Sequence, residues 1–162
     1  MVETERIADE LDRIEHGQAW HGPAIQEALA DLTAGQAAAR AIPAAHSIWE
    51  IVLHMTAWAN EVARRLAAGA HQLRGEEDWP RVGETDEASW SQAKAKLAEA
   101  HRRLRQAVRE FPPGRVYEPV LAGDGLVRAE SFYVMLHGLA QHDAYHTGQI
   151  SLLKKALLGR AS

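Results

Sequence analysis

The 162-residue chain contains no cysteine, and this absence excludes several kinds of chemistry at once. Without thiols the protein has no disulfide bond, no cysteine-ligated zinc, no iron–sulfur cluster and no cysteine nucleophile. No stretch approaches the run of about 18 apolar residues that suggests a membrane span. Two of the first five residues are glutamates, and no apolar stretch follows them. The start of the chain is therefore unlike a secretory signal. These absences predict a soluble, cytoplasmic protein with no membrane partner.

An excess of positive charge is also absent. The chain has 18 Lys and Arg residues against 22 Asp and Glu, which gives a formal net charge of −4. Nucleic acid is therefore not an expected partner, because binding to phosphates needs a basic surface. The chain has one basic cluster, made of Arg102, Arg103, Arg105 and Arg109. We expect this cluster on a solvent-facing helix surface that it shares with acidic residues.

Residues that favour β-strands are few. Valine, isoleucine and threonine are sparse and aromatic residues make up 6%, whereas there are 30 alanines. This composition favours helices over strands. The length suits one domain and is too short for two ordinary ones, so we predict a single domain over residues 1–162.

Apolar residues at helical spacing predict four long helices, over about 4–32, 47–69, 85–111 and 130–158. The first must kink or restart at Pro23, which cannot donate a backbone hydrogen bond. The second begins with Ser47 and Glu50, whose spacing fits a capping box. The third stops at the Pro112–Pro113–Gly114 sequence, and the last ends at Gly159.

The connection over residues 70–84 is long for two helices that turn straight back on each other. Fifteen extended residues reach roughly 50 Å, whereas a 24-residue helix is only about 36 Å long. This connection can therefore cross the whole bundle. The sequence predicts an all-α fold, a four-helix bundle with a long crossover connection between its second and third helices. Residues 115–129 form either a small hairpin or a structured loop.

Nine histidines give the composition's one hint of chemistry. His142 and His146 are four residues apart, so both side chains lie on one helix face and can reach one metal ion. The apolar stripe around them, from Met135 to Leu157, is the expected buried seam of the helix. His54 lies in a similar stripe on the second helix.

If the second and fourth helices are antiparallel, the rise per residue places His54 at about the same height in the bundle as His142 and His146, after a modest shift of one helix along the other. The sequence therefore permits a three-histidine metal site between two helices. The alternative is that these are separate core histidines, each with its own hydrogen-bond partner. No His-Glu-x-x-His motif is present, so the protein is not a metalloprotease of the kind that carries that motif.

Other residues are candidates for the surroundings of the site. Asp143 points about 100° away from His142 on a helix, where it suits contacts behind a ligand or on the surface. We predict that a pocket draws on Trp20, His21 and Trp58, because the Trp20–Pro23 break beside a core is a natural pocket wall. His16, His71 and His101 are expected on the surface, His46 in a loop, and His137 off the buried seam in a structural role.

Several segments together resemble the DinB/YfiT-like family of metal-dependent enzymes. They are Ala19–Pro23, His46–His54, Asp78–Pro80 and His137–Ile150, of which the last is the most specific. The resemblance implies a bundle with the crossover described above. It also implies a divalent metal held by three histidines, which here are His54, His142 and His146. Members of this family often form homodimers, and characterised relatives include thiol S-transferases and a thiol-dependent isomerase.

Two hypotheses follow for the function. The first is a metal-dependent enzyme acting on a small molecule, as a thiol S-transferase with a low-molecular-weight thiol or as a hydrolase. Zinc or nickel is the first expectation for the metal, because imidazole ligands suit both. The second hypothesis is a non-catalytic bundle, a stress protein that binds a metal or a small ligand. The sequence leaves the substrate open, and it names no catalytic residue beyond the metal ligands.

Overall fold

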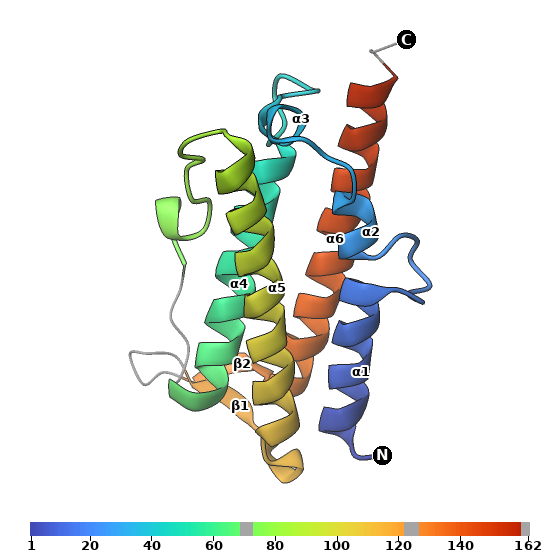
Figure 1. The fold of residues 1–162 in the computed structure, drawn as a ribbon. Coiled ribbons are helices and arrows are strands. Elements are labelled where there is room, and N and C mark those ends of the chain that lie inside the picture. Colours follow the sequence, from blue (N-terminus) through green and yellow to red (C-terminus); the bar gives the residue numbers. More distant parts are fainter. Residues whose placement is uncertain (69–72, 122–126, 160–162) are drawn as a thin grey trace.

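The computed structural model describes residues 1–68, 73–121 and 127–159. Most of these residues are helical (Figure 1). The long helices are α1 (Glu3–His16), α4 (Ile48–Ala68), α5 (Glu87–Glu110) and α6 (Phe132–Leu158). Two short ones, α2 (Ile25–Leu29) and α3 (Ala34–Ala38), follow α1. The all-α fold class is confirmed.

The connection between α4 and α5 crosses the length of the bundle. In Figure 1 the two helices run in the same direction, side by side, and the chain between them returns along their outer side. A short 3-10 turn, η1 (Gly75–Glu77), lies on this path. Helices α1 and α6 run the opposite way, and each of them packs against α5 or α4. The predicted crossover between parallel helices is therefore present.

The first predicted helix is interrupted, and the interruption is a restart. Helix α1 ends at His16, and Gly17 adopts a φ of 136°, which an L side chain rarely tolerates. Helix α2 begins two residues after Pro23, where the carboxylate of Glu27 accepts from the backbone N–H of Ala24 at 2.8 Å. Helix α3, a five-residue helix capped by the hydroxyl of Thr33, was not predicted from the sequence.

The predicted start of α4 has the expected hydrogen bonds. The Ser47 hydroxyl accepts from the Glu50 backbone N–H at 3.2 Å, and the Glu50 carboxylate accepts from the Ser47 N–H at 2.7 Å. Asp86 caps α5 and Ser131 caps α6 in the same way. These caps fix where each helix begins, and hence the height of its side chains in the bundle.

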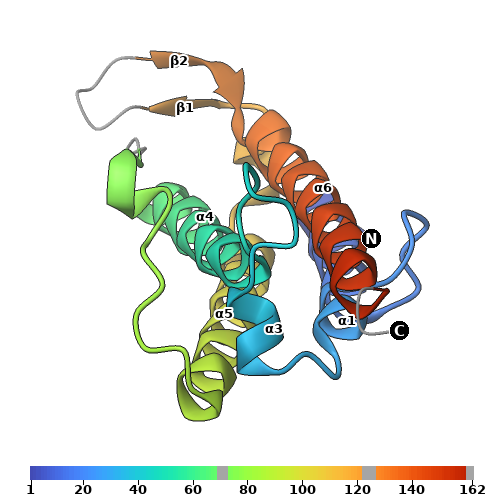
Figure 2. The ribbon, with the colours of Figure 1, turned by 90° about the horizontal axis from the view of Figure 1, so that it is seen from above.

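A small antiparallel hairpin precedes α6, as one of the two alternatives for this segment predicted. Strand β1 (Pro119–Leu121) pairs with β2 (Val127–Ser131), with Pro119 opposite Ser131. Figure 2 shows the hairpin at the side of the bundle where α6 begins. The predicted helix end at Gly69 and the histidine at position 71 lie outside the described residues.

The core runs between the long helices and contains mainly aliphatic side chains. Trp90 is its largest fully buried side chain, and it packs at a tilt against Trp49 with 5.0 Å between ring centroids. The indole N–H of Trp90 donates to the backbone carbonyl of Leu32 at 2.8 Å. This bond ties α5 to the segment between α2 and α3. Within the described residues, no helix carries an apolar stretch long enough to cross a membrane.

Two residues of α5 that were expected to face solvent are buried. His101 is 4% exposed and Arg105 is 7% exposed, and Arg105 pairs with the buried carboxylate of Glu15 on α1. The expectation was wrong because these positions share the helix face of Leu97 and Leu104. Arg102 and Arg103 do lie in solvent, where both pair with Glu99.

Replacing Trp90 by Phe should lower the free energy of unfolding by about 1–3 kcal/mol, because the buried Leu32 carbonyl loses its donor. Urea denaturation followed by far-ultraviolet circular dichroism measures this change. Trp20→Phe is the matched control, since that side chain is fully exposed, and it should shift stability by less than about 0.5 kcal/mol. Equal unfolding midpoints for the two variants would contradict the assigned role of Trp90.

Candidate metal centre

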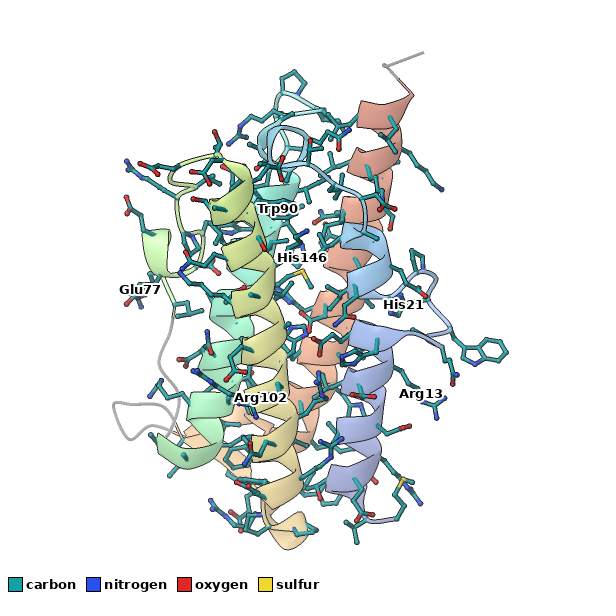
Figure 3. All side chains as sticks on the ribbon, in the orientation of Figure 1. Arg13, His21, Glu77, Trp90, Arg102 and His146 are labelled. Atoms are coloured by element: carbon teal, nitrogen blue, oxygen red, sulfur yellow. The ribbon has the colours of Figure 1, made fainter. Side chains whose placement is uncertain are left out.

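Three histidine rings meet in the interior between α4 and α6. His54 comes from α4, while His142 and His146 come from successive turns of α6. The Nε2 atoms of His54 and His142 are 2.9 Å apart, and one nitrogen from each of the three rings lies within 4.8 Å of the others. His54 and His146 are each only 5% exposed, and His146 lies among the side chains between the helices (Figure 3).

Each ring has an oxygen atom beside its Nδ1. His54 Nδ1–H donates to the backbone carbonyl of Asp78 at 2.7 Å. His146 Nδ1–H donates to the side-chain oxygen of Gln149 at 2.7 Å. The Nδ1 of His142 faces a carboxylate oxygen of Asp143 at 3.3 Å. Because these oxygens only accept, they favour the tautomer that carries its hydrogen on Nδ1 and has a lone pair on Nε2, which metal-ligating histidines usually adopt.

This tautomer makes the contact between His54 and His142 informative. Neither Nε2 carries a hydrogen, so two lone pairs face each other at 2.9 Å and repel. A shared cation would turn this repulsion into attraction. Two nitrogens bound to one ion at the usual bond length are about 2.8–3.4 Å apart. The three residues therefore fit a divalent metal, and they would hold it through Nε2.

The crossover connection forms one wall of the site. The ring of Trp79 stacks on His54 with 3.9 Å between centroids and 6° between planes. It also stacks on His46, at 3.6 Å and 7°. The carboxylate of Asp78 accepts from the indole N–H of Trp58 at 2.8 Å, which anchors the loop to α4. Asp78 thus anchors the loop through its side chain and orients His54 through its backbone carbonyl.

Burial favours the neutral form of His54 and His146. It lowers the pKa of His146 from 6.5 to about 4, with a smaller contribution from the neighbouring His142 ring. Burial also lowers the pKa of His54, although the bond to Asp78 opposes this in part. A metal binds only the neutral ring, so both histidines are in the binding form at neutral pH.

Two hollows reach the site from different sides. One, of about 380 Å³, is bordered by His146, Gln149, Trp79 and His46, together with apolar side chains such as Ile42 and Leu152. The other, of about 340 Å³, is bordered by His142, Trp58 and Arg65. A small molecule in either hollow would lie against a ring of the three-histidine cluster.

Comparison with known proteins identifies the family. The family model of the DinB superfamily matches residues 19–150. The chain belongs to the DinB superfamily. No curated protein and no solved structure matched the chain.

The DinB assignment covers the segments that carry the three histidines, and the structure brings these rings together. It also places Trp58 beside them, with its ring centroid 6.0 Å from that of His142. Asp143, predicted to lie behind a ligand or on the surface, is fully buried behind His142. The three rings form one cluster, and each of them also has its own oxygen partner, as the alternative of separate core histidines predicted.

Trp20 and His21 are placed elsewhere, which corrects the prediction that they line the pocket of the metal site. Both side chains are exposed, and they border a hollow between α1 and α6 with Gln141 and Ala144. Figure 3 shows His21 on the loop outside α1, away from His146. The reason lies in the backbone: Gly17 and Gly22 both adopt positive φ and carry this loop outward from the bundle.

Three contributors to the site were missed. Gln149 could have been found from its spacing, because it lies three residues after His146 on the same helix face. His46 is exposed, yet it borders the hollow that reaches His146. Trp79 gave no signal in the sequence that it would stack on His54, since helical spacing does not extend to a loop. His137, given a structural role, pairs with Glu10 of α1 at 2.9 Å.

The metal-free protein should lose stability as the pH falls from about 6.5 towards 4. The unfolded chain takes up a proton on His146 near pH 6.5, whereas the folded protein does so only near its lowered pKa of about 4. Protons therefore favour the unfolded state in this window, and this penalty is absent above it. Urea denaturation at several pH values measures the slope. His146→Gln, which cannot titrate, should show a shallower slope, and identical slopes would count against the neutral buried ring.

Proposed function

We propose that this protein is a metal-dependent enzyme that acts on a small molecule. The observation that carries the proposal is the cluster of three histidine rings, one nitrogen of each lying within 4.8 Å of the others, with an oxygen beside each Nδ1. Three neutral imidazoles cancel none of the charge of a divalent ion, and a three-ligand site keeps a position open for a guest. Zinc and nickel are the first candidates for the metal, because imidazole suits both.

A bound ion would supply Lewis acidity, which lowers the pKa of a guest thiol or water. The residues of the chain would exclude water and orient the guest. Trp79 and the apolar side chains of the hollow beside His146 would exclude water from a guest. Gln149 and Tyr145 border the same hollow and offer polar groups that would orient it. Such a wall suits a small, mainly apolar substrate with one or two polar groups.

Thiol transfer is the reaction that we favour. An ordinary thiol has a pKa of about 8.5, whereas the pKa of water is much higher, so a thiol needs less assistance to ionise. The chain has no cysteine that could serve as its own nucleophile. A low-molecular-weight thiol would therefore enter as a second substrate. Its sulfur would bond to an electrophilic carbon as the bond from that carbon to a leaving group breaks, and the thiol proton would pass to the leaving group or to solvent.

Hydrolysis is the second candidate, and one observation favours it. His46 borders the same hollow as His146, and its ring is held by stacking on Trp79. A histidine in that position is suited to accept a proton from an attacking water. The carboxylate of Glu50 lies 3.6 Å from His46 Nδ1 and would stabilise the protonated ring.

Alanine at any one of the three cluster positions should abolish tight metal binding, because two imidazoles remain. Untagged protein is loaded with zinc or nickel, desalted and examined by elemental analysis, which should give about one ion per wild-type chain and far less for His142→Ala. The control is His16→Ala, which removes an exposed histidine on α1 outside the cluster. Metal retained by all three cluster variants would refute the site.

Activity of the metal-loaded protein is assayed with a panel of low-molecular-weight thiols and electrophiles, and separately with small esters and amides. We expect metal-dependent thiol consumption that falls at least 100-fold in His142→Ala. Metal-dependent hydrolysis that is weakened by His46→Ala, without thiol consumption, would favour the second candidate. Tight metal binding with no turnover in either panel would favour a non-catalytic metal-binding protein.

A further inference from the structure

A buried carboxylate lies behind the metal cluster. Asp143 follows His142 on α6 and is 0% exposed. One carboxylate oxygen, Oδ1, lies 3.3 Å from His142 Nδ1. The other, Oδ2, lies 3.5 Å from Nε2 of His101 on α5. Neither His101 Nε2 nor Asp143 Oδ2 has a hydrogen-bond partner among the described residues.

On the side of His101 away from Asp143, two charged side chains pair with each other. Glu15 of α1 pairs with Arg105. Its carboxylate lies 3.9 Å from His101 Nδ1, which is too far for a hydrogen bond. Asp143 is therefore the acceptor nearest to an N–H of His101. A buried carboxylate oxygen without a donor is costly, and a shift of a few tenths of an ångström closes the 3.5 Å gap.

Burial determines the form in which His101 can act. The side chain is 4% exposed, and burial lowers its pKa while the carboxylate of Asp143 opposes this. A neutral ring carries one hydrogen. On Nε2 this hydrogen faces Asp143, and on Nδ1 it would leave the oxygen of Asp143 without a donor. The surroundings favour the Nε2–H form.

We infer that His101 is a positioning residue for the metal centre. Its Nε2–H holds Asp143 in the orientation in which Oδ1 accepts from His142, so that His142 presents Nε2 to the ion. The inference rests on the proposed metal site. His101 itself does not touch the ion, because Asp143 lies between it and the nearest ligand. Once the 3.5 Å gap between His101 and Asp143 closes, a row of hydrogen bonds would run from α5 to His142 on α6, which would hold the ion.

The test compares two substitutions of His101 by metal affinity. His101→Leu fills a similar space without a donor, whereas His101→Gln keeps an N–H that can reach Asp143. Zinc affinity is measured by competition with a chromophoric chelator. We expect His101→Leu to weaken binding about 10–100-fold, the usual effect of losing a partner behind a ligand, and His101→Gln to remain within a few-fold of wild type. His16→Leu, the same change at an exposed site, should leave affinity unchanged.

If His101 had only a structural role, its substitution would change stability but would not produce this pattern of zinc affinities. Urea denaturation of the metal-free variants separates the two effects, and the visible spectrum of the cobalt-loaded protein reports the ligand geometry. Against an Asp143→Asn background, His101→Leu should cost little further affinity, because its effect passes through that carboxylate. A full additional loss in that background would overturn the inference.

The outcomes distinguish this inference from the metal site itself. Wild-type protein that binds no zinc overturns both. Wild-type protein that binds zinc tightly while His101→Leu binds equally well overturns the inference alone. Should His101→Leu fail to fold, His101→Asn takes its place, because its shorter amide cannot reach Asp143, and the same loss of affinity is expected.

Discussion

The central constraint in this protein is the meeting of unprotonated imidazole nitrogens in a buried place. His54 and His142 face each other through Nε2 at 2.9 Å, and His146 completes the cluster. Two such lone pairs gain nothing from their proximity unless a cation joins them. The rings are nevertheless held there, because each Nδ1 is committed to an oxygen of the surrounding protein. The arrangement of α4 and α6 makes physical sense as the support of an ion.

The crossover between α4 and α5 contributes to the site as well as to the topology. A short turn would join two antiparallel helices, whereas here the chain returns along the outside and brings Asp78 and Trp79 to His54. One residue orients the ring through its carbonyl, and the next covers it with an indole. The connection that makes the two helices parallel therefore also completes the wall of the metal centre and of the hollow beside His146.

Four buried polar side chains lie together behind the cluster. Glu15, Arg105, His101 and Asp143 are all buried, and they come from three different helices. Burial of such groups costs free energy unless each is paired, and apolar side chains of similar size would be easier to accommodate. Their cost is offset where they orient a ligand. The family membership, the three-histidine cluster and this polar row all point to the same part of the molecule.

The sequence was enough to predict α4, α5, α6 and the crossover, because helical spacing and a capping box act over a few residues and leave a regular pattern. It did not reveal α3 or the full length of the break after α1. The homodimer and the cellular compartment stay predictions. Tertiary structure alone decided that Trp79 stacks on His54, that Trp20 and His21 turn away, and that His101 lies inside. Loop directions depend on a few glycine torsions, and a buried polar residue is recognisable only once its partner on another helix is in place. Such contacts join residues far apart in the chain, where no local pattern records them.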